Sequence, residues 1–223
     1  MRWYVNQDIL KIGALVLMTI EHIASIGYGV KTGWPILLGR MAYPIFAWLI
    51  ALHLTHNVGF VKYLKRLFVF GIITFVALLP FGVYDTLLWS FMVPVACIGI
   101  WEEIEGKSFS KTVKFWMKSG IFVCGIFVSL FLYYSCFGFF YILAAYSVIR
   151  HYSIIKAFLS ICMGFLLNPT LVLFATVSAV TTVFLIKVKK SSHRFLAYKY
   201  AFYIYYPAHL VILHILKSIG VFG

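Results

Sequence analysis

Charged side chains are scarce in this sequence: Asp, Glu, Lys and Arg make up only 11% of its 223 residues. A soluble globular domain carries about 25% charged residues and about 45–50% apolar ones. Here 63% of the residues are hydrophobic and the mean hydropathy is +0.99. The composition argues against a soluble helical domain and predicts an all-α, polytopic integral membrane protein.

Other signals are missing as well. The four cysteines form no CxxC motif with metal-ligand spacing, so we interpret them as small hydrophobic residues and expect no metal site. The net charge of +13 comes without a basic stripe on a polar fold, so no nucleic-acid partner is expected. The first apolar run is not followed by the small-residue cleavage site of a signal peptide. No internal repeat or long linker is visible, which predicts a single transmembrane domain over residues 1–223 and disfavours a transporter built from two matching halves.

Long apolar segments dominate what is present. A bilayer core of about 30 Å needs about 20 apolar residues per helix. On this basis we expect about nine transmembrane helices, within a range of roughly eight to ten. They are placed at residues 9–29, 35–54, 66–83, 86–101, 115–133, 138–150, 153–167, 170–187 and 197–217, of which the sixth and seventh are short for a full crossing.

The distribution of Lys and Arg predicts the orientation. Positive clusters fall in the even-numbered connections: Lys62, Lys65 and Arg66 in the second, Lys107, Lys111, Lys114 and Lys118 in the fourth, Arg150 and Lys156 in the sixth, and Lys187, Lys189, Lys190 and Arg194 in the eighth. The odd-numbered connections carry only Lys31. Because positive loops face the cytoplasm, we expect a cytoplasmic N-terminus and, with nine spans, a C-terminus on the outer side.

Three ionisable residues interrupt the apolar segments near the N-terminus. Glu21 and His22 lie in the first segment and Arg40 lies in the second. Such residues cost roughly 2.5–3.5 kcal/mol at membrane depth and are kept where they are paired or used. The connection over residues 31–34 makes the two helices antiparallel neighbours, which brings Arg40 within reach of Glu21 or His22. His209, in the last segment, is a further candidate, and a purely structural Glu21–Arg40 ion pair is the alternative.

Weaker candidates lie nearer the cytoplasmic side. His53 and His56 have an i, i+3 spacing without a third metal ligand nearby, so we interpret them as interfacial, with a role at a cofactor entrance as the alternative. The lysines of the fourth connection are explained by topology, although they could also steer an anionic cofactor. Five tyrosines near the start of the last segment are interpreted as packing or interface aromatics: Tyr198, Tyr200, Tyr203, Tyr205 and Tyr206.

Three blocks of sequence, two near the N-terminus and one near the C-terminus, carry a family resemblance. They are residues 8–23, which contain Glu21-His22, then Gly39-Arg40-Met41-Ala42-Tyr43-Pro44-Ile45-Phe46-Ala47, and finally Tyr203-Ile-Tyr-Tyr-Pro-Ala-His209-Leu-Val-Ile-Leu. In this order they resemble the TraX family, the membrane pilin acetylases of conjugative plasmids. The middle of the chain, from about Phe68 to Lys190, is similar only in hydropathy. The family usually has Asp where this chain has Glu21, so the carboxylate here reaches one methylene further.

The resemblance implies a bacterial inner-membrane enzyme that moves an acetyl group from acetyl-CoA to the N-terminal amine of pilin. An α-amine has a pKa of about 8, so a modest base suffices, and His22 is the candidate. Either Glu21 orients the His22 ring, or, because adjacent helix residues diverge by about 100°, Glu21 pairs with Arg40 and His22 works alone or with His209. Arg40 either stabilises the tetrahedral oxyanion or holds a cofactor phosphate. The expected catalytic residues are thus His22, Glu21, Arg40 and His209, and the expected acetyl-CoA-binding residues are Arg40, His53, Lys62 and Arg66.

Other functions are compatible with these residues. A multi-span acyltransferase acting on a glycan, lipid or wall precursor shares the His, the Arg and the donor, and differs only in its acceptor. The next alternative is a non-enzyme: a transporter, or a helper that inserts pilin into the membrane. A helper would tolerate loss of His22 and Arg40. For a pilin acetylase, the donor is cytoplasmic whereas the pilin N-terminus is expected on the outer side. The acetyl group must then travel along a cavity or be relayed through an enzyme residue.

Overall fold

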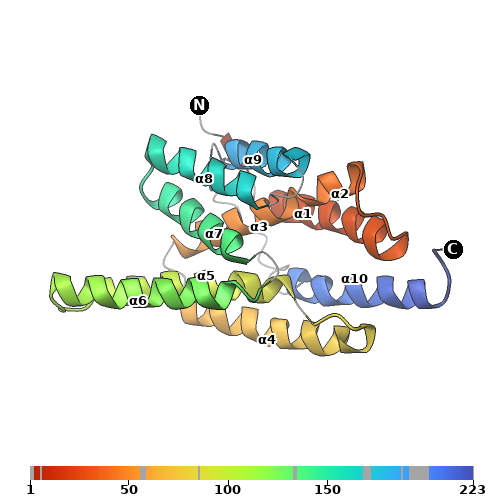
Figure 1. Ribbon diagram of the computed structural model, residues 1–223, viewed down its shortest axis with the longest axis horizontal. Helices are drawn as coiled ribbons and strands as arrows, with labels where there is room; N and C mark the ends of the chain where they lie inside the picture. The colour runs from red at the N-terminus through yellow and green to blue at the C-terminus, as the bar shows by residue number, and fades with distance from the viewer. Residues whose placement is uncertain are drawn as a thin grey trace.

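The computed structural model describes residues 3–5, 7–55, 59–84, 86–132, 135–167, 172–186, 188–190 and 201–222, and this part of the chain is very largely helical (Figure 1). The α-helices are α1 (Gln7–His22), α2 (Trp34–Gly39), α3 (Ala42–Leu54), α4 (Phe60–Leu78), α5 (Leu87–Glu105), α6 (Lys111–Ser129), α7 (Ser135–Arg150), α8 (Ile154–Leu166), α9 (Val172–Ile186) and α10 (Ala201–Ser218). A π-helix, η1 (Ile23–Gly27), continues α1, and a 3₁₀ turn, η2 (Leu79–Phe81), continues α4.

Each predicted apolar segment corresponds to one helical segment, once α1 is joined to η1, α2 to α3, and α4 to η2. Five of these segments are long and apolar enough to cross a membrane: Gln7–Gly27, Trp34–Leu54, Phe60–Phe81, Leu87–Glu105 and Lys111–Ser129. Apolar helices of 10–17 residues lie within α7, α8 and α9. The helical class is therefore confirmed and the apolar helices indicate a membrane protein, while the number of crossings stays a prediction.

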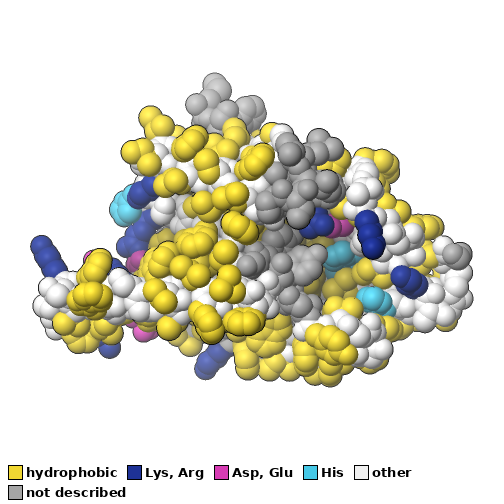
Figure 2. Space-filling model, in the orientation of Figure 1, with side chains coloured by type: hydrophobic (Ala, Val, Ile, Leu, Met, Phe, Trp, Pro, Cys, Tyr) yellow, Lys and Arg dark blue, Asp and Glu magenta, His cyan; other side chains and the backbone are white. Residues whose placement is uncertain are grey.

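Successive helical segments, with α2 and α3 taken as one, run in opposite directions along the long axis of the molecule. The turns from α5 to α6 and from α7 to α8 lie at one end, and those from η1 to α2 and from η2 to α5 lie at the other (Figure 1). The space-filling view shows hydrophobic side chains over most of the visible face, with Lys and Arg side chains toward both ends of the long axis (Figure 2).

One detail of the sequence prediction was wrong. Lys62, Lys65 and Arg66 lie in the first turns of α4 rather than in a loop, and α6 begins at Lys111, so three of the predicted loop lysines are helical. Long basic side chains can cover apolar surface while their charged ends reach water, so a membrane helix can extend into a charged segment. Beside the helices, β1 (Trp3–Val5) pairs in parallel with β2 (Val188–Lys190), a short contact that leaves the helical class unchanged. Strands of three residues are too short to show an alternating pattern.

Helix α3 is the centre of the fold. Ten of its 13 residues are buried, and it packs against α1, α5, α7 and α9. Its largest buried side chain, Trp48, is 1% exposed. A helix that is hydrophobic on every side is stable only when it is surrounded. Because α3 is held on all sides, the residues at its two ends, Arg40 before it and His53 in its last turn, have fixed positions within the bundle.

Candidate functional site

Helix α1 changes its winding directly after Glu21 and His22. The next five residues, Ile23–Gly27, form the π-helix η1, in which the Tyr28 amide donates to the Ile23 carbonyl at 3.3 Å. Single π-turns inside α-helices are rare and are found frequently at functional sites. Here the wider turn contacts both α2 and α10, so it links the end of α1 to these two elements.

Glu21 faces Arg40. Arg40 Nε lies 3.6 Å from Glu21 Oε1, and both side chains are largely buried, at 21% and 16% exposure. Arg40 stands in the break between α2 and α3. Pro44 has no N–H to bond the carbonyl of Arg40, which interrupts the helical ladder at this point. The close approach of Glu21 depends on Gly39, because a Cβ there would overlap with the Cβ and a carboxylate oxygen of Glu21.

His22 faces the opposite neighbour, α10. Its Nδ1 lies 2.8 Å from Nε2 of His209, which is 7% exposed. The two ring planes differ by 13° and the ring centres are 5.1 Å apart. Rings stacked face to face would keep their atoms about 3.5 Å apart or more, so the 2.8 Å contact places the rings edge to edge in nearly one plane. In that plane the ring lone pair points at the donated proton, which is the favourable geometry for a hydrogen bond.

The direction of this hydrogen bond follows from the next contact along α10. His209 Nδ1 lies 2.8 Å from the backbone carbonyl of Tyr205, and a carbonyl only accepts, so Nδ1 of His209 carries a proton. In a neutral His209 the other nitrogen, Nε2, is then the acceptor, and His22 Nδ1 must donate to it. We assign the tautomers from this network. His22 is left with an unprotonated Nε2, which has a lone pair available.

Tyr205 and Tyr206 belong to the site although the sequence analysis interpreted them as packing aromatics. The Tyr205 ring stacks on His209 with ring centres 4.9 Å apart, and its hydroxyl lies 2.7 Å from Oγ1 of Thr19. The Tyr206 ring lies 5.9 Å from that of His209, and its hydroxyl accepts from the Leu87 amide at 3.2 Å. Their spacing contained the signal: Tyr205 precedes His209 by four residues, and Thr19 precedes His22 by three, which places each pair on one helix face.

Comparison with known proteins gives one result. A family described as "TraX protein" matches residues 6–217, nearly the whole chain. The chain belongs to the TraX family. This confirms the resemblance seen in the terminal blocks and extends it across the middle of the chain, and it associates the protein with conjugation and with pilin. Neither the curated proteins nor the solved structures contain a match.

The residues expected to bind a cofactor are only partly together in this TraX-family chain. His53 and Arg66 both contact the side chain of Tyr63. The ring centres of His53 and Tyr63 are 4.8 Å apart, and the guanidinium carbon of Arg66 lies 5.5 Å from the Tyr63 ring centre. The neighbouring Lys62 is exposed, and its carbonyl accepts from Arg66 Nε at 3.2 Å. Arg40 is not part of this group. It lies at the other end of α3, about 20 Å away at 1.5 Å per residue, and His56 lies outside the described residues.

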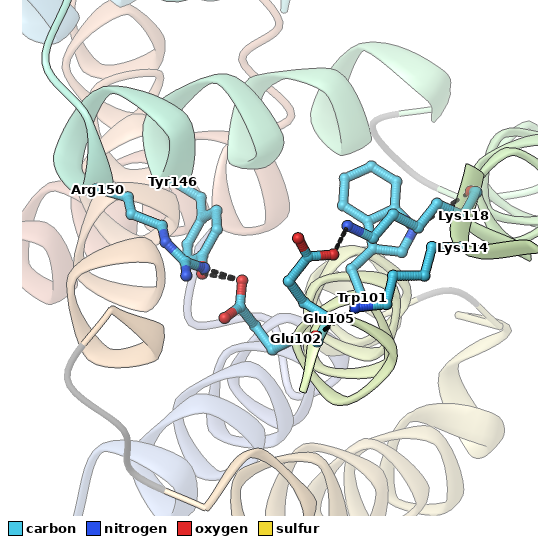
Figure 3. A network of polar contacts seen from close by, with 7 residues as sticks. All are labelled: Trp101, Glu102, Glu105, Lys114, Lys118, Tyr146 and Arg150. Carbon is cyan, nitrogen blue, oxygen red and sulfur yellow. Dashed lines mark hydrogen bonds and ion pairs between the residues drawn. The ribbon is translucent and has the colours of Figure 1, made fainter. Parts of the chain in front are cut away.

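Two of the four lysines of the fourth connection, Lys114 and Lys118, take part in a polar network (Figure 3). Lys118 pairs with Glu105, and Lys114 donates to the Glu105 carbonyl at 2.8 Å. On the other side of α5, Glu102 accepts from Arg150 and, at 2.9 Å, from the Tyr146 hydroxyl. The network joins the ends of α5, α6 and α7. Part of the positive charge that could steer an anionic cofactor is therefore balanced by carboxylates of α5.

Proposed function

We propose that this protein is a membrane acetyltransferase that moves the acetyl group of acetyl-CoA to the N-terminal amine of a conjugative pilin. The observation that supports it most is the His22–His209 hydrogen bond, whose direction leaves Nε2 of His22 unprotonated. No described residue donates a hydrogen bond to that nitrogen. Family membership supplies the link to pilin. An amine that attacks a thioester requires a base held in position by a second group, and His22 with His209 has this arrangement.

The proposed reaction begins when the pilin amine attacks the thioester carbonyl carbon. A C–N bond forms, the carbonyl becomes a tetrahedral oxyanion, and the amine proton passes to Nε2 of His22. The resulting imidazolium keeps its Nδ1–H bond to His209, whose own Nδ1–H is held by the Tyr205 carbonyl. Collapse of the intermediate breaks the C–S bond, and the coenzyme A thiolate takes the proton from His22. Atoms and charge balance without a further reactant.

Arg40 suits the oxyanion better than the cofactor phosphates. It is fixed by Glu21 next to His22, and about 20 Å of helix separates it from the His53–Arg66 group. A preformed positive group at the developing oxyanion is usually a large contributor to catalysis. We therefore assign Arg40 to the reacting carbonyl, and His53, Lys62 and Arg66 to the phosphate end of acetyl-CoA. With this division the thioester would lie at the Arg40 end of α3 and the phosphates at the His53 end.

The test uses the full chain purified into lipid nanodiscs, with acetyl-labelled acetyl-CoA and a peptide that carries a pilin N-terminus. Transfer to the peptide amine should fall by about 100-fold or more in His22→Gln, because general-base catalysis contributes roughly that factor. His151→Gln is the matched control, since His151 is an exposed residue after α7. Label that appears in lipid or glycan, with none in the peptide, would indicate an acyltransferase with another acceptor. Pilin binding without any transfer, unchanged in His22→Gln, would favour an insertion helper.

The route of the acetyl group can be tested in the same preparation. Rapid acid quenching should trap an acyl-histidine on the protein if the group is relayed through the enzyme. Direct transfer leaves the protein unlabelled at every quench time while the peptide gains label.

A further inference from the structure

Tyr205 is the residue through which α10 is joined to α1 beside the histidine pair. The Thr19 hydroxyl donates its only proton to the Leu15 carbonyl at 2.7 Å. The 2.7 Å contact between Thr19 Oγ1 and the Tyr205 hydroxyl must then be donated by Tyr205. The donors and acceptors of this cross-helix bond are thus as definite as those of the His22–His209 bond, and the two bonds lie one turn apart on both helices.

The same tyrosine fixes the His209 ring in two further ways. Its backbone carbonyl accepts from His209 Nδ1 at 2.8 Å, and its ring lies against the His209 ring with the planes 12° apart. The carbonyl sets which nitrogen of His209 carries the proton, and the stacked ring limits rotation of the imidazole. A rotation of His209 about its side-chain bonds would break the coplanar contact with His22, so the Tyr205 ring also protects that geometry.

We infer that Tyr205 is a positioning residue for His22: by holding α10 on Thr19 and fixing the His209 ring, it sets the tautomer that leaves Nε2 of His22 free to accept a proton. Tyr205 does not touch the reacting atoms in this account. Its effect on catalysis rests on the proposed acetyltransferase function. Its effect on the tautomers of the two histidines rests on the hydrogen bonds alone.

The most selective variant is Tyr205→Phe, which removes the hydroxyl and keeps both the aromatic ring and the backbone carbonyl. Thr19→Val removes the acceptor from the other side, and Thr19→Ser keeps it. A matched control exists elsewhere in the chain. Tyr141 on α7 forms the same type of bond, 2.9 Å from the Thr182 hydroxyl on α9, and both residues are fully buried. Tyr141→Phe therefore removes a comparable interhelical hydrogen bond away from the histidines.

The first readout is nitrogen-15 NMR of histidine-labelled full-length protein in nanodiscs, with His22 and His209 signals assigned by their loss in His22→Gln and His209→Gln. The unaltered protein should show both residues protonated at Nδ1 and unprotonated at Nε2. In Tyr205→Phe and in Thr19→Val, the His22 signals should move toward a mixture of tautomers, while Thr19→Ser and Tyr141→Phe keep the original spectrum.

The second readout is steady-state kinetics of acetyl transfer. Interhelical hydrogen bonds in membrane proteins contribute modestly, so kcat should fall by about three- to tenfold in Tyr205→Phe and Thr19→Val, with KM for acetyl-CoA unchanged within about twofold. Thr19→Ser should restore most of kcat. His22 tautomer signals identical in Tyr205→Phe and the unaltered protein would overturn the positioning role. If the tautomers shift as expected and the unaltered protein transfers no acetyl group, the positioning role stands and the proposed function fails.

Discussion

The contact between Gly39 and Glu21 gives the most stringent test of the site's geometry, through the substitution Gly39→Ala. An added Cβ would overlap with Glu21 Cβ and one carboxylate oxygen, and would lie 2.7 Å from the carboxylate carbon. Because the Cβ of Glu21 is fixed to the backbone of α1, rotation of the side chain relieves only part of the overlap. Helices α1 and α2 must therefore move apart, which also weakens the Glu21–Arg40 pair.

The size of the effect can be worked out from these two consequences. Overpacking a close contact costs about 1–3 kcal/mol. Weakening a charge pair that is mostly buried adds about 1 kcal/mol or more. The free energy of unfolding should therefore fall by about 2–4 kcal/mol, and at about 2–4 °C per kcal/mol the Tm should fall by roughly 4–16 °C. Acetyl transfer should fall as well, because Arg40 loses the position that Glu21 gives it.

The assay is thermal unfolding of the purified protein in nanodiscs, followed by tryptophan fluorescence, with acetyl transfer measured on the same samples. Gly13→Ala is the matched control: Gly13 lies on α1, the helix that carries Glu21, and a Cβ there meets nothing within 4 Å. Its stability should stay the same or rise by up to about 1 kcal/mol, since Ala favours a helix interior over Gly. Equal Tm values and equal activity for Gly39→Ala and Gly13→Ala would refute the packing of Glu21 against the α2–α3 break.

Three further predictions follow from the same contacts. Arg40→Ala should lower the free energy of unfolding by about 1–3 kcal/mol, and adding Glu21→Gln should recover part of it; additive losses in the double-variant cycle would show that the two side chains do not interact. Arg66→Ala should raise KM for acetyl-CoA by roughly tenfold with kcat nearly unchanged, whereas a loss confined to kcat would remove Arg66 from the cofactor site. Glu102→Gln should lower the free energy of unfolding by less than about 1 kcal/mol, since the pair with Arg150 is exposed. The difference in Tm between this variant and the unaltered protein should shrink when melting is measured at high instead of low salt.

The sequence predicted the helical segments well because a membrane helix leaves a strong local signal. About 20 apolar residues in a row are needed to cross a bilayer, and that run is visible without knowledge of any partner. The ends of the helices were harder to predict. α4 begins at Phe60 and α6 at Lys111, several residues before the apolar runs, because lysine and arginine are compatible with helix and hydropathy does not detect them.

The site was predicted in part for the same reason. Ionisable residues within apolar segments stand out, so Glu21, His22, Arg40 and His209 could be found from the sequence, and the 100° between neighbouring helix positions suggested that Glu21 and His22 face different partners. The structure shows this arrangement, with Arg40 on one side and His209 on the other. Their catalytic roles stay a prediction.

What the sequence could not show depends on contacts between distant segments. Thr19 and Tyr205 are 186 positions apart, and nothing local indicates that their hydroxyl groups meet. The direction of the histidine hydrogen bond also depends on a backbone carbonyl, which every residue has and no sequence pattern distinguishes. The need for glycine at position 39 likewise comes from a contact with Glu21 on another helix, which the sequence does not show.

The most direct test of the central claim is the intact mass of the pilin made in the same cells as this protein. Pilin would be purified from cells with the unaltered chain, without it, and with His22→Gln. We expect one added acetyl group at the pilin N-terminus with the unaltered chain and none in the other two samples. Equal pilin masses in all three samples would contradict acetylation of pilin, and an acetyl group that persists with His22→Gln would contradict the role of His22 as the base.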